Sequence, residues 1–291
     1  MCDQHFEDDF KKYLDRGYVT RRDFGALSAG AAVTFLLPGI AGAQEVTGSD
    51  VEITTPDGVA DCYFVHPSSG SHAAVLVWPD ILGLRTAFRQ MGRRLAASGY
   101  SVLVVNPFYR DARAPVVPEG STFNDESVRN TVFGLRNNVS NENMVTDARA
   151  FISWLDEQSQ VDTSRRIGTT GYCMGGPYVM RTAAAVPERV GAVGSFHGGG
   201  LVTDEPDSPH RLVGQMDAQF LIAIAENDDE KDPEDKVLLR AAYDEAGVNA
   251  EIEVYEGTLH GWCPPDGNAY NEAQAERAWG RMLALFEREL G

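Results

Sequence analysis

The feature that most constrains the fold of this chain is a regular alternation between short apolar runs and segments with helical periodicity. Residues 73–78 and 101–106 are nearly continuous apolar runs, which is typical of strands buried on both faces of a parallel sheet. Between these runs, Phe88, Met91 and Leu95 recur at helical spacing. Strands that alternate with helices in this way predict a parallel sheet covered by helices on both faces, and therefore an α/β fold.

The alternation continues to the end of the 291 residues without a repeat or a low-complexity tract. We expect an N-terminal hairpin because two alternating runs flank a Pro-Asp-Gly turn. Residues 107–141 contain several Pro, Gly and Asn residues and are expected to be irregular, either as a lid or as a surface loop. The other expected strands are 51–55, 60–66, 167–170, 190–196, 220–225 and 250–255, and the other expected helices are 143–158, 177–185, 233–246 and 271–290.

The N-terminal segment differs in composition from the rest of the chain. Arg21 and Arg22 form a twin-arginine pair, a Gly- and Ala-rich apolar stretch follows over residues 25–40, and residues 41–43 read Ala-Gly-Ala. This order is typical of a signal peptide with small residues at its cleavage site, and the stretch is too short and too poor in Leu and Ile to span a membrane. We expect residues 1–43 to direct export to the periplasm by the Tat pathway, leaving one domain over residues 44–291. The alternative is a cytoplasmic protein that begins with an amphipathic helix.

The charge of the chain excludes several classes of partner. Asp and Glu number 43 against 25 Lys and Arg, a net charge of −18, and removal of the six acids and five bases of residues 1–43 would leave −17. A surface with this much negative charge repels phosphate backbones and anionic lipid. We therefore expect no nucleic-acid partner and no membrane association of the mature form. A small molecule is the expected partner, and the sequence leaves the oligomeric state open.

The cysteines and histidines predict neither a disulfide scaffold nor a metal site. Cys2, Cys62, Cys173 and Cys263 are too few and too scattered for a disulfide framework or a zinc ribbon. No set of His, Cys and carboxylate residues has metal-ligand spacing, so no metal and no cofactor are expected. In an exported chain only a Cys62–Cys263 disulfide would leave Cys173 reduced.

The sharpest motif lies at the end of an expected strand. Residues 167–176 read Ile-Gly-Thr-Thr-Gly-Tyr-Cys-Met-Gly-Gly and are followed by an expected helix. A strand, a Gly-x-Cys-x-Gly-Gly turn and a helix predict a nucleophile elbow with Cys173 as the nucleophile, because the abrupt turn needs the clearance of Gly171 and Gly175. The start of the helix would favour the thiolate. The alternative is a structural cysteine in a glycine-rich turn.

An elbow of this kind needs an acid and then a histidine later in the chain. Asp228 follows the expected strand 220–225 and is the preferred acid, with Asp229 as the second choice; the alternative is a solvated acidic loop. His260 follows the expected strand 250–255 and is the candidate general base, although it could be an ordinary surface histidine. His197 ends another strand at the same edge of the sheet and could touch a substrate.

A second loop is expected to complete the site. Residues 78–83 read Trp-Pro-Asp-Ile-Leu-Gly and follow a central strand. In an elbow-containing fold this loop supplies one backbone N–H of the oxyanion hole, and the residue after the nucleophile supplies the other. The expected donors are the amides of Ile81 and Met174.

Together these motifs resemble the dienelactone hydrolase family of the α/β-hydrolase superfamily. The likeness covers nearly all of residues 50–290 and rests on G-Y-C-M-G-G, the acid in A-E-N-D-D, the H-G-W loop and P-D-I-L-G-L. It implies an α/β-hydrolase fold and a hydrolase of carboxylic esters or lactones. The family's acid that contacts the resting thiol corresponds to Asp80. Of the arginines that hold the substrate carboxylate, one corresponds to Arg110, whereas the position soon after His260 is occupied by Cys263 and two prolines.

The sequence therefore predicts a Cys–His–Asp hydrolase with a preference for neutral esters or lactones with small acyl groups. Trp262, together with Phe108 and Tyr109, suggests an apolar wall around the substrate. Only Arg110 could replace the missing arginine and favour a carboxylated lactone. The alternative function is a periplasmic binding or scaffolding protein that keeps the fold without turnover.

Overall fold

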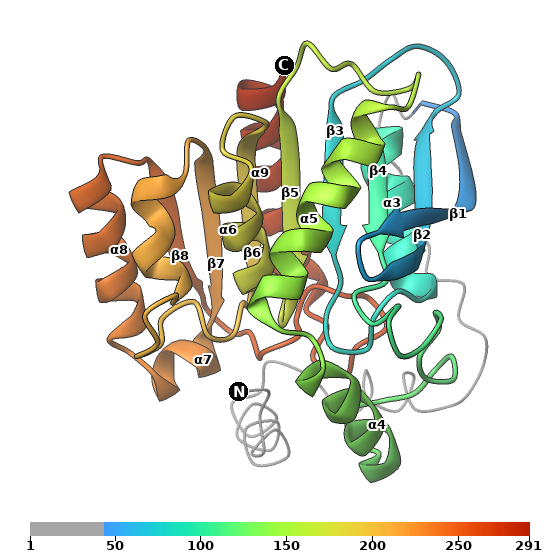
Figure 1. The fold of residues 1–291 in the computed structure, drawn as a ribbon. Helices are drawn as coiled ribbons and strands as arrows, with labels where there is room; N and C mark the ends of the chain where they lie inside the picture. Colours follow the sequence, from blue (N-terminus) through green and yellow to red (C-terminus); the bar gives the residue numbers. More distant parts are fainter. Residues whose placement is uncertain (1–43) are drawn as a thin grey trace.

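A computed structural model describes residues 44–291, which form one eight-stranded sheet with the order β1-β2-β4-β3-β5-β6-β7-β8 (Figure 1). The strands β3 to β8 run parallel, and the hairpin of β1 and β2 adds to one edge in antiparallel orientation. The bounds are β1 (Val46–Thr55), β2 (Gly58–Pro67), β3 (Ala74–Trp78), β4 (Ser101–Val105), β5 (Ile167–Tyr172), β6 (Val190–Phe196), β7 (Gln219–Ala225) and β8 (Ala250–Tyr255).

Helices cover both faces of the sheet, as the alternation in the sequence predicts. One face carries α3 and α9, and the other carries α5, α6 and α8, with α4 beyond the end of the sheet (Figure 1). The helices are α3 (Thr86–Ala97), α4 (Glu126–Asn137), α5 (Asn141–Asp156), α6 (Gly175–Ala185), α7 (Glu226–Lys231), α8 (Asp235–Ala246) and α9 (Glu272–Leu290), and a 3₁₀ helix spans Pro209–Gln215. This is an α/β-hydrolase fold.

Two hydrophobic cores lie on opposite faces of the sheet. Successive residues of the central strand β3 contribute to different cores: Leu76 packs toward α5 and α6, whereas Val75 and Val77 pack toward α3 and α9. All five residues of β3 are buried. The nearly continuous apolar runs in the sequence therefore reflect strands that are covered on both faces.

A helix forms within a segment that was predicted to be irregular. Within residues 107–141, expected to be irregular, Glu126–Asn137 forms α4. Asp125 caps this helix by accepting a hydrogen bond from the Ser127 amide, and Val128 and Val132, four residues apart, are buried. The helix therefore forms because a cap and a short apolar stripe lie among the Pro and Asn residues that suggested a loop.

The Cys62–Cys263 disulfide, which the sequence left open, is not formed in the structure. Cys62, Cys173 and Cys263 are all free thiols in the structure. Cys62 belongs to the core on the α5 and α6 side of the sheet, and Cys263 belongs to the core on the α3 and α9 side. The sheet therefore separates the two sulfur atoms.

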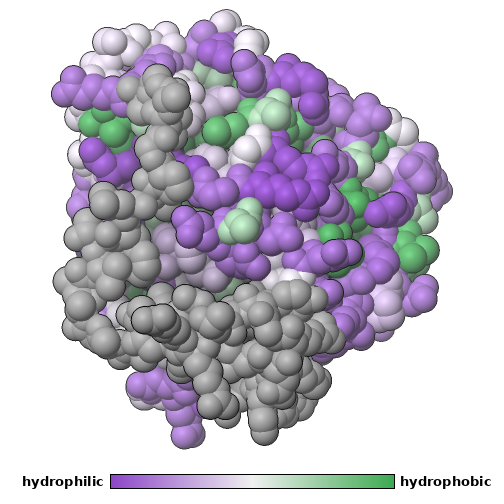
Figure 2. All heavy atoms as spheres, turned by 180° about the vertical axis from the view of Figure 1, so that it is seen from behind, coloured by the Kyte–Doolittle hydropathy of each residue, from purple (hydrophilic) through white to green (hydrophobic). Residues whose placement is uncertain are grey.

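The predicted signal peptide, residues 1–43, lies outside the described residues. Among residues 44–291, no helix combines the length and the apolar character needed to cross a membrane. Hydrophilic residues dominate the coloured part of the face shown in Figure 2, and the hydrophobic residues there form separate small groups.

Candidate active site

Cys173 occupies a sharp turn between β5 and α6. Its backbone has φ +51°, a left-handed conformation that residues with a side chain rarely adopt. A Cβ added at Gly171 would lie 2.1 Å from the Gly175 carbonyl oxygen, and one added at Gly175 would lie 2.3 Å from the Trp78 carbonyl oxygen. The turn therefore needs glycine at both positions, because only glycine leaves the space that the motif requires.

The thiol of Cys173 lies at the start of a helix and opens into a cavity. The residue is buried, and α6 begins two positions later at Gly175. The positive end of a helix dipole stabilises a nearby negative charge and favours thiolate over thiol. Cys173 and His260 both line a cavity of about 100 Å³ at the ends of the parallel strands.

His260 is held by two side chains from α7. Its Nδ1 lies 2.8 Å from Oδ2 of Asp228, and its backbone N–H donates to Oδ1 of Asn227 at 2.7 Å. A carboxylate at Nδ1 accepts that proton and leaves Nε2 as the basic nitrogen of the ring. Asp228 lies in the short helix α7, which the sequence did not predict, and not in the solvated acidic loop that was the alternative. Asp229, the second choice for the acid, binds Nζ of Lys236 at 2.6 Å.

His197 lies behind the elbow. It has no exposed surface, its backbone φ is +40°, and its Nδ1 accepts a hydrogen bond from the Cys173 amide at 3.1 Å. Its ring meets the His260 ring edge to face, with centroids 5.2 Å apart. Burial, reinforced by His260, holds the pKa of His197 well below its usual range, so the ring is neutral. His197 is not among the described residues that line the cavity, so it contacts the backbone of Cys173 instead of facing the cavity.

Three segments form the walls of the cavity. They are the loop that follows β3, the loop that follows His260, and residues 121–124, which belong to the segment expected to be a lid or a surface loop. Ile81 lines the cavity, and Met174 follows Cys173 as the residue that caps α6. Phe123 is the one aromatic side chain among the described lining residues other than His260.

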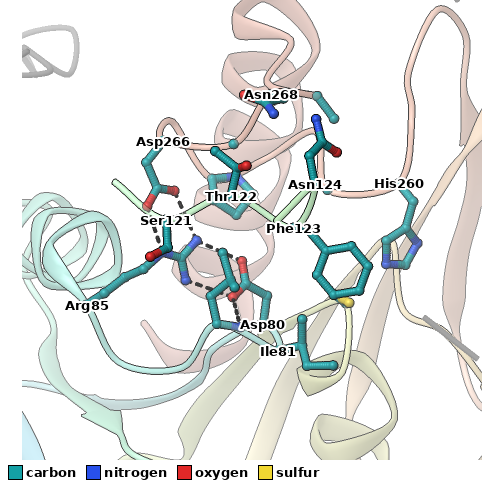
Figure 3. Close-up of a pocket in the computed structure, with 16 residues that line it drawn as sticks. Asp80, Ile81, Arg85, Ser121, Thr122, Phe123, Asn124, His260, Asp266 and Asn268 are labelled. Atoms are coloured by element: carbon teal, nitrogen blue, oxygen red, sulfur yellow. Dashed lines mark hydrogen bonds and ion pairs between the residues drawn. The ribbon is translucent and has the colours of Figure 1, made fainter. Parts of the chain in front are cut away.

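A buried ion bridge forms one side of the cavity. The guanidinium of Arg85 lies between the carboxylates of Asp80 and Asp266, as Figure 3 shows. Nη1 of Arg85 donates to Oδ1 of Asp80 at 2.7 Å, and Nε donates to Oδ2 of Asp266 at 2.6 Å. Oδ1 of Asp80 also accepts the Leu82 amide at 2.9 Å, so the bridge fixes the loop that carries Ile81.

Arg85 and Asp266 were not among the residues predicted from the sequence. They lie 181 positions apart and belong to no recognisable motif, so only the fold brings them together. The one usable signal is the position of Arg85, directly after the motif loop and before the amphipathic helix α3. Asp80 does line the cavity, but its carboxylate is held by Arg85 and the Leu82 amide.

Arg110 does not reach the cavity, contrary to its predicted role. It donates two hydrogen bonds to Asp147, both of 2.8 Å, and pairs with Asp57 at 2.6 Å. The Asp147 side chain is only 2% exposed, and a carboxylate so deeply buried needs a counter-charge. Burial raises the pKa of Asp147, and Arg110 and Tyr109 oppose this shift. Arg110 is therefore occupied by an internal carboxylate.

The predicted apolar wall is also wrong. Trp262 has no exposed surface, and its ring stacks on Tyr255 with centroids 4.8 Å apart. Phe108 and Tyr109 belong to the core next to α5. These aromatic residues follow strands because they fill the cores, and none of the three lines the cavity. Within residues 44–291, no group of three or more His, Cys, Asp or Glu side chains is arranged to hold a metal ion.

Comparisons with known proteins show the family and the fold of the chain. A sequence profile of the dienelactone hydrolase family matches residues 60–290. A Salmonella typhi protein provisionally named carboxymethylenebutenolidase is 27% identical over 230 residues, which cover 77% of this chain and 81% of that protein. A carboxymethylenebutenolidase of Rhodococcus opacus is 24% identical over 232 residues, which cover 78% of this chain and 86% of that protein. The fold is similar to the crystal structure of a dienelactone hydrolase-like promiscuous phosphotriesterase from metagenomic libraries, with a TM-score of 0.70, 22% identity, and coverage of 86% of this chain and 100% of that one.

Proposed function

Because the chain belongs to the dienelactone hydrolase family, we propose that it hydrolyses small carboxylic esters or lactones through an acyl-enzyme intermediate on Cys173. One observation carries the proposal: Cys173, in its strained elbow conformation, shares a cavity with His260, whose Nδ1 is 2.8 Å from Asp228. A nucleophile, a base and a residue that orients the base are the parts that covalent acyl transfer needs.

In the proposed reaction the sulfur of Cys173 attacks the carbonyl carbon of the substrate. The amides of Ile81 and Met174 hold the negative oxygen of the tetrahedral intermediate. His260 receives the thiol proton and passes it to the leaving alkoxide as the C–O bond breaks, and Asp228 orients the ring and stabilises its positive charge. A water molecule, deprotonated by His260, then hydrolyses the thioester, which releases the carboxylic acid and restores the thiol. With a lactone the alcohol stays attached, so the product is a hydroxy acid.

The nucleophile favours esters and lactones over amides. A thiolate is a better leaving group than an amide nitrogen that has not been protonated, so a tetrahedral intermediate formed with an amide returns to the starting materials more readily. The small size of the cavity, about 100 Å³, supports a short acyl group.

The test is a rapid-mixing assay with an activated aryl ester such as p-nitrophenyl acetate. The wild-type protein should release a burst of p-nitrophenol equal to the enzyme concentration, and Cys173→Ala should show neither the burst nor turnover. Cys263→Ala is the matched control, because Cys263 is a buried thiol of the opposite core. Wild-type turnover by Cys173→Ala would contradict the proposed nucleophile. Tight binding of a lactone without turnover would favour the alternative, a binding or scaffolding protein.

Brief alkylation with iodoacetamide followed by mass mapping gives an independent check. Burial raises the pKa values of the Cys62 and Cys263 thiols, so both stay protonated and unreactive at neutral pH. Cys173 should be alkylated first among these three. A faster reaction of either buried thiol would contradict the assignment.

A further inference from the structure

We infer that the bridge of Asp80, Arg85 and Asp266 makes this cavity select against anionic substrates, so that the ester or lactone it accepts carries no negative charge. The inference rests on the proposed hydrolysis at Cys173 and concerns which substrates reach that thiol. The evidence for it is the hydrogen bonds, the charge and the burial of the bridge. Figure 3 shows the bridge beside the other lining residues.

Arg85 has no hydrogen-bond donor left for a substrate. A guanidinium carries five N–H groups. Nη1 donates to Asp80 and to the Gly83 carbonyl at 3.2 Å, Nη2 donates to Asp80 at 2.9 Å and to Asp266 at 3.0 Å, and Nε donates to Asp266. These five bonds use all five groups. A substrate carboxylate could reach the guanidinium only by displacing a carboxylate of the protein.

The bridge carries a net negative charge. Two carboxylates face one guanidinium, so their formal sum is −1. Burial opposes the charge of Arg85, but Asp80 and Asp266 outweigh this effect and raise the pKa of its guanidinium, so the cation is permanent. Arg85 is also the one cationic arginine or lysine among the described lining residues. No unpaired cation is therefore available there to compensate a carboxylate that leaves water.

Burial makes displacement costly. The side chains of Arg85 and Asp80 are 6% and 12% exposed, and that of Asp266 is 26% exposed. Removing one partner of a buried pair leaves an uncompensated charge in a medium that solvates it poorly. An anionic substrate that took the place of Asp266 would leave that carboxylate unpaired, and one that did not would face it across the cavity.

Asp266 is the residue to change, because Asp80 also holds the Leu82 amide and with it the loop of Ile81. Asp266→Asn keeps the shape of the side chain and its carbonyl oxygen and changes the formal sum of the bridge from −1 to zero. Asp266→Glu keeps the charge. Asp217→Asn is the matched control: this carboxylate is 84% exposed, pairs with Arg166, and precedes β7, at the end of the sheet opposite the cavity.

The assay compares kcat/KM for p-nitrophenyl esters of three short acids, one neutral (butyrate), one anionic (hemisuccinate) and one cationic (trimethylammonioacetate). For the wild-type chain we expect the neutral ester to exceed the anionic ester by tenfold or more, with the cationic ester at least as good as the anionic one. Asp266→Asn should reduce the neutral-to-anionic ratio about tenfold. Asp266→Glu and Asp217→Asn should leave that ratio within twofold of the wild-type value.

Two results would overturn the inference: a wild-type preference for the anionic ester, or an equal change of the ratio in Asp266→Asn and Asp217→Asn. The wild-type comparison needs no variant, so the inference stays testable if Asp266→Asn folds poorly. Failure of the proposed function would give a different result from failure of this inference. If the proposed function is wrong, no ester is hydrolysed, or hydrolysis persists in Cys173→Ala, whatever the charge of the acyl group.

Discussion

His197 occupies the least favourable environment of any histidine that the structure describes. A non-glycine residue at φ +40° and an imidazole without solvent contact both cost free energy. Its Nδ1 accepts the Cys173 amide, and its ring meets the His260 ring. We expect His197 to act as a positioning residue that holds the elbow and limits the motion of the His260 ring.

This environment predicts how stability depends on pH. The pKa of His197 in the folded protein lies well below the ordinary value of 6.5, so below about pH 6.5 the unfolded chain binds a proton that the folded chain does not. Stability is then lost as the pH falls through that value, by at most about 1.4 kcal/mol per pH unit. Asparagine tolerates positive φ and can accept the Cys173 amide, so His197→Asn should keep the fold and flatten this pH dependence.

Urea unfolding at pH 7, 6 and 5 measures the effect. His72→Asn is the control, because His72 is a partly exposed histidine beside the surface residue Ser69. The control should follow the wild-type curve, whereas His197→Asn should lose less stability between pH 7 and pH 5. Parallel curves for the wild type and both variants would contradict the assigned neutral state.

The residues of the site differ in how far the sequence could predict them. Cys173, Asp228 and His260 each lie at the C-terminal end of a predicted strand, so the order of elements was enough to place them at one edge of the sheet. Arg85 and Asp266 meet only after folding. Arg110 is a predicted substrate-binding residue because it corresponds to an arginine of the resembled family, but the buried carboxylate of Asp147 binds it instead.

Among the elements, the elbow depends most strictly on residue type. Gly171→Ala would place a methyl group 2.1 Å from the Gly175 carbonyl oxygen, which belongs to the backbone and has no rotamer to change. We expect a loss of at least about 1–3 kcal/mol in the free energy of unfolding, together with loss of ester hydrolysis.

Gly134→Ala is the matched control for this prediction. Gly134 lies within α4, is exposed, and has nothing within 4 Å of an added Cβ. Alanine is the better helix former, so this variant should be more stable by up to about 1 kcal/mol and fully active. Thermal melts and ester assays of both variants decide the matter. Equal stability of the two variants would contradict the steric argument.

The elements differ in how closely their bounds could be predicted. The strands β6 and β8 have the bounds expected from their sequence, 190–196 and 250–255, although β6 is buried throughout and β8 is not. Helix α4 was missed because the Pro, Gly and Asn residues around it are typical of a loop. The aromatic residue Trp262 was misplaced because a pattern of hydrophobic residues does not tell a core wall from a pocket wall.

At the scale of the whole molecule, we propose that residues 1–43 direct export by the Tat pathway and that the mature chain begins at Gln44. The twin arginines and the small residues before Gln44 support this proposal. Intact-mass analysis of a periplasmic fraction should give a chain without residues 1–43. A full-length chain confined to the cytosol would contradict it and favour the cytoplasmic alternative.

The seclusion of the Arg85 bridge has a consequence for how the protein responds to dissolved salt. The net charge of −18 repels anions from a distance, but this repulsion is screened within about 10 Å at 0.1 M ionic strength and about 3 Å at 1 M. The bridge is partly buried, with the Asp266 side chain 26% exposed, and partly buried charges are screened much less than exposed ones. Raising sodium chloride from 0.1 M to 1 M should therefore speed anionic esters only until the long-range repulsion is gone. The ratio of kcat/KM between neutral and anionic esters that remains at 1 M sodium chloride is then due to the bridge. At both salt concentrations this remaining preference should disappear only in a variant that neutralises Asp266.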